Sequence, residues 1–201
     1  MIRLMFVGDG DRDAAMNPPL VQTLLQAEIE ATSGAWARLH KGGRGYDRKL
    51  LFAIRQARDE GLQGVVATVD QDKSRGRDRL RDMRAARTRD RETAAPLPAA
   101  LGCANPHAEA WLLDDEMAVR TVLKLDARIA IPNVRKAQYP KDELTGLHTQ
   151  SPRAGTPIRA ILVEIARNID PARCPHRNET GFAQFVDEVR DEIGPLARAR
   201  A

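Results

Sequence analysis

The chain has 201 residues, of which 30% are charged and 42% hydrophobic, and its formal net charge is +4 at pH 7. These proportions are those of a globular protein. The length suffices for one α/β domain, or for one domain with an appended lobe. Aromatic residues make up only 4%, which argues against a surface that binds nucleic-acid bases mainly by stacking.

Several absences bear on where the protein works. No apolar run approaches the roughly 20 residues needed to span a bilayer, and no signal-peptide cleavage site follows the apolar start. The two cysteines, Cys103 and Cys174, are far apart and form no C-x-x-C motif. We therefore expect a reduced, cytoplasmic protein with no membrane partner.

The first third of the chain predicts two strands and two helices. Residues 2–7 favour a strand that ends in the sequence GDGDRD. Asn17 and Pro18 are typical of a helix start, with Asn17 as the cap. Residues 35–40 predict a second strand and residues 47–60 a second helix.

A basic, glycine-rich loop, KGGRG, precedes the second helix and contains Lys41 and Arg44. Its bare backbone amides could approach a phosphate group. It lacks the ending of a nucleotide-binding P-loop, so a plain mobile loop is the other interpretation.

The stretch GVVATVDQD contains the strongest signal. Residues 65–69 are apolar and mostly β-branched, which suits a strand buried on both faces of a parallel sheet. Asp70 and Asp72 follow at the carboxyl end, where open α/β sheets place their chemistry. Two such carboxylates can converge on one hard cation such as Mg²⁺, although a helix cap with a solvated neighbour is the simpler alternative.

Residues 73–92 form a strongly basic segment with helical spacing of its few apolar residues. Lys73 adjoins the two aspartates and could contact a phosphate. A net-positive helix in this position could guide a phosphate backbone, and a solvated charged helix explains the pattern equally well. The candidate nucleic-acid ligands are Arg75, Arg77 and Arg79, together with Lys41 and Arg44.

The rest of the chain predicts a fourth strand within residues 96–103 and a helix that starts near Asn105 and Pro106 and carries Glu109. Residues 126–155 contain three separate prolines and polar clusters and predict a loop-rich region. Helices are then expected from Thr156 and from Phe182, the last ending at Gly194 and Pro195. We divide the chain into an α/β core, residues 1–125, and a loop-rich and helical extension, residues 126–201, packing on it.

Three of these stretches resemble the TOPRIM domain, in the compact form of OLD-family and RloB-like proteins. They are the first strand end (VGDGDRD), the third strand end (VDQD) and the helix start NPHAEAWLL. TOPRIM domains carry an acidic residue followed by glycine after the first strand and Asp-x-Asp after the third. The compact families add Pro-x-x-Glu-x-Trp-Leu-Leu. One position departs from the pattern, because Asp9 stands where the first motif normally has glutamate.

The resemblance implies a TOPRIM-like (Rossmann-like) α/β fold with a mainly parallel sheet flanked by helices and a helical C-terminal part. It also implies a Mg²⁺-dependent (or Mn²⁺-dependent) nuclease of a bacterial defence or genome-maintenance system, acting on DNA or RNA. The expected metal ligands are Asp9, Asp70 and Asp72, and the expected catalytic residues are Asp9, Glu109 and Lys73. Such proteins often work beside a separately encoded ATPase, which would be a partner here because the chain has no P-loop.

Two other functions remain open. The second hypothesis is a non-catalytic TOPRIM-like module that binds an ATPase partner or nucleic acid. Asp9 supports it, because aspartate reaches less far than the usual glutamate. A flavodoxin-like domain that binds a nucleotide or phosphate is the third, because phosphoryl-transfer receivers also gather acids at strand ends. Metal-dependent cleavage would favour the first function, and an acyl-phosphate on Asp70 the third.

Overall fold

The computed structural model describes residues 1–43, 45–71, 75–135 and 137–199, without the side chains of residues 40–42 and 75–77. Its centre is a sheet of four parallel strands in the order β2-β1-β3-β4. The strands are β1 (Ile2–Gly8), β2 (Ile29–Ala35), β3 (Gly64–Asp70) and β4 (Ala99–Ala104). The predicted α/β class, a mainly parallel sheet flanked by helices with a helical C-terminal part, is confirmed.

Two hydrophobic cores lie on opposite faces of the sheet. Leu4 and Phe6 of β1 face one core, and Met5 and Val7 face the other. This alternation is the period of a strand. Because β1 and β3 are the central strands, both of their faces are covered, which explains why their sequences are nearly continuous apolar runs.

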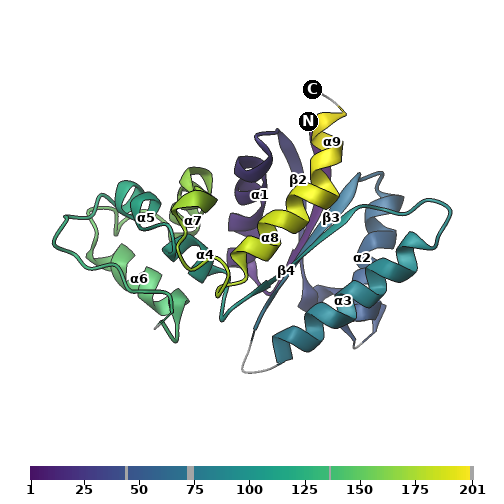
Figure 1. Ribbon diagram of the computed structural model, residues 1–201, viewed down its shortest axis with the longest axis horizontal. Coiled ribbons are helices and arrows are strands. Elements are labelled where there is room, and N and C mark those ends of the chain that lie inside the picture. The colour runs from purple at the N-terminus through teal and green to yellow at the C-terminus, as the bar shows by residue number, and fades with distance from the viewer. Residues whose placement is uncertain (44, 72–74, 136, 200–201) are drawn as a thin grey trace.

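Helices cover both faces (Figure 1). On one face lie α2 (Tyr46–Asp59) and α3 (Arg75–Arg91), and on the other α1 (Asp11–Leu25) and α8 (Phe182–Glu188). The short η1 (Trp36–Gly42) packs beside α2. Beyond α8 the chain continues helically through η3 (Val189–Ile193) and α9 (Gly194–Arg198).

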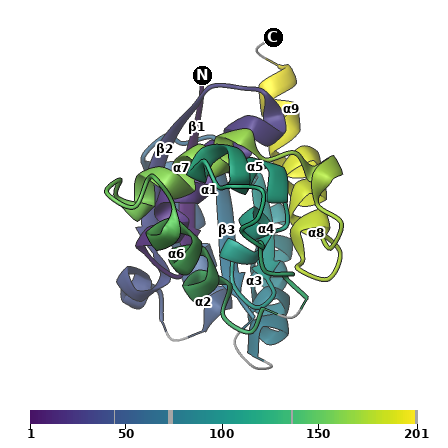
Figure 2. The same ribbon diagram turned by 90° about the vertical axis from the view of Figure 1, so that its left-hand side faces the viewer.

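A group of shorter helices stands to one side of the sheet, in front of it in Figure 2. It comprises α4 (Glu109–Leu113), α5 (Glu116–Leu123), α6 (Pro140–Gln150) and α7 (Ile158–Asn168), followed by η2 (Pro171–Arg173). Helix α7 lies against α1, and α4 contacts α5, α6 and α7. The predicted division at residue 125 does not divide the core, since Leu20 and Leu112 share a hydrophobic cluster with Ile161 and Phe185.

Two predictions in the first third of the chain were wrong. Helix α1 begins at Asp11, so Pro18 and Pro19 lie inside it. Burial of Met16, Leu20 and Val21 by α1 outweighs the roughly 3 kcal/mol that an interior proline costs. The second strand is β2, and residues 36–42 form η1 instead. Most of β2 is exposed, so it carries no apolar pattern to detect.

Three further predictions were wrong in the second half. Helix α4 starts at Glu109, three residues after Pro106. The region predicted as loop-rich contains α6, in which Pro140 occupies the first turn, where proline is tolerated. Gly194 and Pro195 do not end the last helix, because the chain widens into the π-helical η3 and then resumes as α9. Within the described residues, no helix is long and apolar enough to cross a bilayer.

Candidate functional site

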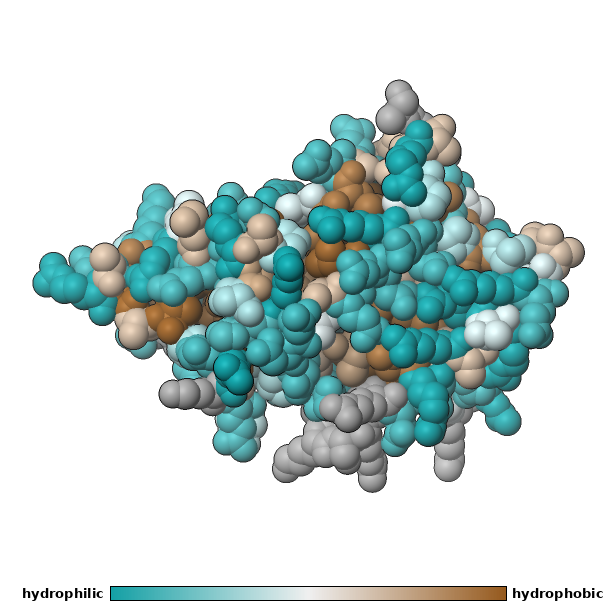
Figure 3. Space-filling model, viewed as in Figure 1, coloured by the Kyte–Doolittle hydropathy of each residue, from teal (hydrophilic) through white to brown (hydrophobic). Residues whose placement is uncertain are grey.

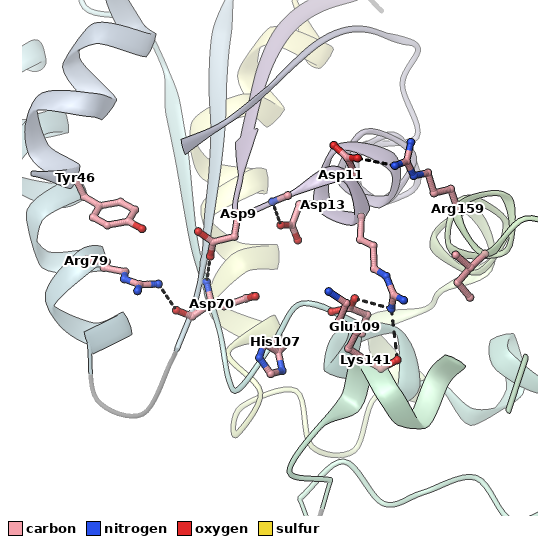
Figure 4. Close-up of a pocket in the computed structure, with 13 residues that line it drawn as sticks. Asp9, Asp11, Asp13, Tyr46, Asp70, Arg79, His107, Glu109, Lys141 and Arg159 are labelled. Atoms are coloured by element: carbon pink, nitrogen blue, oxygen red, sulfur yellow. Dashed lines mark hydrogen bonds and ion pairs between the residues drawn. The ribbon is translucent and has the colours of Figure 1, made fainter. Parts of the chain in front are cut away.

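The carboxyl ends of β1 and β3 bring Asp9 and Asp70 together (Figure 4). Asp70 is the last residue of β3, and Asp9 directly follows β1. The Asp70 backbone amide donates a hydrogen bond to Asp9 Oδ2, with a donor–acceptor distance of 2.8 Å. The Asp70 carboxylate in turn accepts the Ala108 amide at 3.1 Å. The carboxyl ends of the first and third strands therefore meet, whereas metal binding by Asp9 and Asp70 stays a prediction.

A third carboxylate, Asp13, belongs to the same group. It lies in the first turn of α1, where its Oδ2 accepts the Gly10 amide at 3.0 Å. Only 8% of Asp13 is exposed. Gly8 makes this placement possible, because a Cβ on Gly8 would lie 2.5 Å from the Asp13 Cβ. No side chain other than glycine fits at that strand end without moving α1.

Glu109 is the fourth carboxylate, and it is held from both sides. Trp111, two residues later, is fully buried and stacks on Phe185 with ring centroids 4.7 Å apart. This packing fixes α4, whose first residue is Glu109. Leu112, which follows Trp111, is also fully buried. Arg12 forms an ion pair with Glu109 (Nη1 to Oε1, 3.2 Å) and donates to Thr145 Oγ1 at 3.2 Å, which connects α1, α4 and α6.

Burial and crowding raise the pKa of two of these carboxyl groups, Asp70 and Asp13. Burial, and then the negative charges of Asp13, Asp9 and Glu109, raise the pKa of Asp70 to about 8, against the hydrogen bond from Ala108. Burial also raises the pKa of Asp13 to about 6, although the Gly10 amide opposes it. A cation among these groups would favour the charged carboxylates and so lower the pKa of Asp70 and of Asp13.

The carboxylates line an open cavity of about 720 Å³ at the carboxyl edge of the sheet. Figure 4 shows Arg79 and Tyr46 on one side of them and Lys141 and Arg159 on the other. His107 also lines the cavity. The volume of the cavity falls in the range of small-molecule and substrate sites.

Several predicted site residues lie outside the description. These are Asp72, Lys73 and Arg44, and also the side chains of Lys41, Arg75 and Arg77. Among the residues that are described, no group of three or more histidine, cysteine, aspartate or glutamate side chains is arranged to hold a metal ion. Asp9 and Asp70 would thus need further ligands, and the predicted third ligand, Asp72, is one of the residues not described.

Most of the basic helix α3 is engaged within the fold. Arg87 pairs with Glu188, Arg89 with Asp47 and Arg91 with Glu192, while Arg81 pairs with acids of α3 itself. The surface over α3 in Figure 3 is hydrophilic, as this composition requires. Of the predicted nucleic-acid ligands, the structure places Arg79 at the cavity, where its Nη1 donates to the Asp70 carbonyl at 3.2 Å.

Sequence reasoning missed part of the site. Asp13 stands three residues after Gly10, and acids at this position commonly cap a helix start; a helix predicted from Asp11 would have drawn attention to it. A helix predicted from Asp11 would also have placed Arg12 in its first turn. Lys141 and Arg159 were not predicted as site residues, since they reach the cavity through the packing of α6 and α7.

Comparisons of the chain with protein-family models, with curated proteins and with solved structures found no match.

Proposed function

We propose that the chain is a Mg²⁺-dependent nuclease of the TOPRIM type, cleaving phosphodiester bonds at the cavity between β1 and β3. The observation that carries the proposal is the contact between Asp9 and Asp70 at adjacent strand ends, with Asp13 and Glu109 facing the same cavity. A role in bacterial defence or genome maintenance, with a separately encoded ATPase as partner, belongs to the same proposal.

The donor chemistry fits a hard cation. Carboxylate oxygens are the ligands that Mg²⁺ prefers. The raised pKa of Asp70 reflects burial first and then neighbouring negative charges, which a cation would offset. Asp9 and Asp70 would hold the ion, with Asp72 as the predicted further ligand. When bound, Mg²⁺ neutralises the phosphate, lowers the pKa of a water molecule and stabilises the leaving oxygen.

Glu109 is the group best placed to move a proton. Its carboxylate lines the cavity and is otherwise buried, with 4% of the residue exposed. The ion pair with Arg12 holds this carboxylate in one orientation, and a positioned carboxylate can serve as a general base. Asp9 is one methylene shorter than the glutamate of TOPRIM domains, so we assign Asp9 to metal binding and Glu109 to proton transfer.

The test is cleavage of end-labelled single- and double-stranded DNA and RNA by the purified chain, with Mg²⁺, with Mn²⁺ and with EDTA. We expect metal-dependent cleavage, its loss in Asp70→Asn, and a reduction of roughly 10²- to 10⁴-fold in Glu109→Gln, the contribution of a general base. Asp187→Asn, an exposed aspartate of α8, is the matched control and should cleave normally. Full activity of Asp70→Asn would contradict the proposal.

One observation favours a second candidate, the non-catalytic module that binds nucleic acid or an ATPase. The ion pair with Arg12 engages Glu109 in this structure, so its carboxylate already has a partner in place of a reacting water molecule. This candidate predicts metal and nucleic-acid binding without cleavage under any metal. The same assay, combined with a binding measurement, separates the two functions.

A further inference from the structure

Cations line the cavity on two opposite sides of the carboxylates. Arg79 comes from α3, in the helix layer on one face of the sheet. Arg12, Lys141 and Arg159 come from α1, α6 and α7, on the other face. In Figure 4 the carboxylates of Asp9, Asp13 and Asp70 lie between these two groups. The cavity therefore has an acidic floor between two basic walls.

The first wall is held firmly. Arg79 donates to the Asp70 carbonyl, and its guanidinium lies over the Tyr46 ring, 5.3 Å from the ring centroid. Lys49 lies over the same ring at 5.5 Å, and Trp36 meets it edge-on at 5.2 Å. Tyr46 is thus already engaged by three neighbours. We therefore assign this wall to phosphate contact rather than to base stacking.

The second wall is open to solvent. Arg159 pairs with Asp11 at 2.5 Å, but the two side chains are 63% and 65% exposed. Exposed pairs of this kind contribute little to stability, so a phosphate can replace Asp11 at small cost. Lys141 is exposed, and its backbone carbonyl accepts Arg12 at 3.4 Å, which holds the start of α6 at the cavity.

A ligand with one phosphate over the carboxylates would leave at least one wall unused. A ligand with a row of phosphates would place one on the acidic floor, through the metal, and one against each wall. We propose that the cavity binds a nucleic-acid strand by three successive phosphates, so that the cut bond is internal and needs a phosphate on each side. This inference rests on the proposed function and adds to it an endonucleolytic, sequence-independent mode of recognition, because phosphates carry no sequence information.

The test uses short oligonucleotides whose linkages are neutral methylphosphonates except at the centre. One has a single central phosphodiester, two have an added phosphodiester on the 5′ or the 3′ side, and one has both. We expect each added phosphate to raise the rate of central cleavage at least about tenfold, the value of one or two charge-assisted hydrogen bonds. Equal rates for all four oligonucleotides would overturn the inference while leaving the nuclease proposal intact.

Variants assign the walls. Arg159→Gln should abolish the benefit of the added phosphate on one side only, and Arg79→Gln the benefit on the other. Arg128→Gln is the matched control for Arg159, because it is also an exposed arginine paired with an exposed aspartate, Asp126, but lies outside the cavity. Since Arg79 also holds the Asp70 carbonyl, Arg79→Lys, which keeps the charge, should restore the benefit. Equal loss on both sides in either glutamine variant would contradict the assignment.

Binding gives a readout that does not need cleavage. Fluorescence anisotropy in Ca²⁺ compares the fully flanked oligonucleotide with the one that has a single phosphodiester. Tighter binding of the flanked one, with no cleavage in Mg²⁺, would support binding by three successive phosphates and refute the nuclease. Equal binding, or none, would overturn the inference.

Discussion

Asp70 is the residue on which the site depends, and its charge is costly without a cation. Its folded-state pKa is about 8, against an ordinary value of 3.8. The folded chain therefore binds a proton that the unfolded chain releases between about pH 4 and pH 8. Stability falls as pH rises across this window, because the folded state holds more protons there. Below pH 4 both states are protonated and the contribution is fully present.

We predict that Asp70→Asn stabilises the metal-free chain at pH 8 and has little effect at pH 4. Asparagine can still accept the Ala108 amide, so the variant removes the charge and keeps the hydrogen bond. Urea unfolding in EDTA at several pH values measures the difference, for which partial exposure of Asp70 limits the expected size to a few kcal/mol. Asp187→Asn should show no such trend with pH. A variant less stable than the parent at pH 8 would show that the ionised Asp70 carboxylate does not destabilise the folded chain.

At the scale of elements, the junction between β1 and α1 sets the position of two carboxylates. Asp13 approaches the strand end because Gly8 has no side chain, whereas a Cβ on Gly10 would meet nothing within 4 Å. We predict that Gly8→Ser costs about 1–3 kcal/mol, as overpacking does, and weakens Mn²⁺ binding by moving Asp13 and Asp9.

Gly10→Ser provides the matched control for this junction. Gly10 is the cap of α1 and has extended backbone angles that serine adopts readily. Serine is a better helix cap than glycine, so stability should stay equal or rise. Thermal unfolding and Mn²⁺ titration of both variants test the pair. Similar losses in both would mean that the junction tolerates no side chain at either position, contrary to the structure.

The elements that could be predicted from the sequence are those with a periodic pattern of apolar residues. Strands β1 and β3 and helix α2 bury apolar residues in the order that their period requires, and the sequence located them. Strand β2 is held by backbone hydrogen bonds to β1 and has no apolar pattern. Helix α1 contains prolines that a local rule places at a helix start. In each of these failures, tertiary packing outweighed the local preference.

The site followed the same division. Asp9, Asp70 and Glu109 were expected in the site from the resemblance to TOPRIM domains, and the adjacent carboxyl ends of β1 and β3 explain why Asp9 and Asp70 meet. Arg79 of the first basic wall was among the predicted nucleic-acid ligands. The second wall could not be predicted, since Lys141 and Arg159 depend on how α6 packs against α4 and α7 against α1. Such placement is a property of the whole chain, and a single sequence carries no local sign of it.

For the whole molecule, the predicted division at residue 125 raises the question of whether the α/β part is stable alone. Helix α7 packs on α1 and buries Ile161, Leu162 and Ile165 completely. Helix α8 covers β4, where Phe185 meets Gly102 so closely that a Cβ there would lie 2.7 Å from its ring. Helices α7 and α8 therefore supply part of one of the two hydrophobic cores.

We predict that a chain ending at residue 155 loses cooperative folding. It would expose the α7 and α8 sides of the core, including the faces against which Phe182 and Phe185 pack, and each buried side chain of this size contributes about 1.5–3 kcal/mol. The large side chains that the shortened chain loses from this cluster are Ile161, Leu162, Ile165, Phe182, Phe185, Val186, Val189 and Ile193. Together they contribute about 12–24 kcal/mol, which is as large as or larger than the 5–15 kcal/mol by which a typical domain is stable. Circular dichroism during urea titration should show a gradual change for the shortened chain and a sharp transition for a chain ending at residue 198, which keeps α9. A sharp transition in the shorter chain would show instead that residues 1–155 fold cooperatively without α7 and α8.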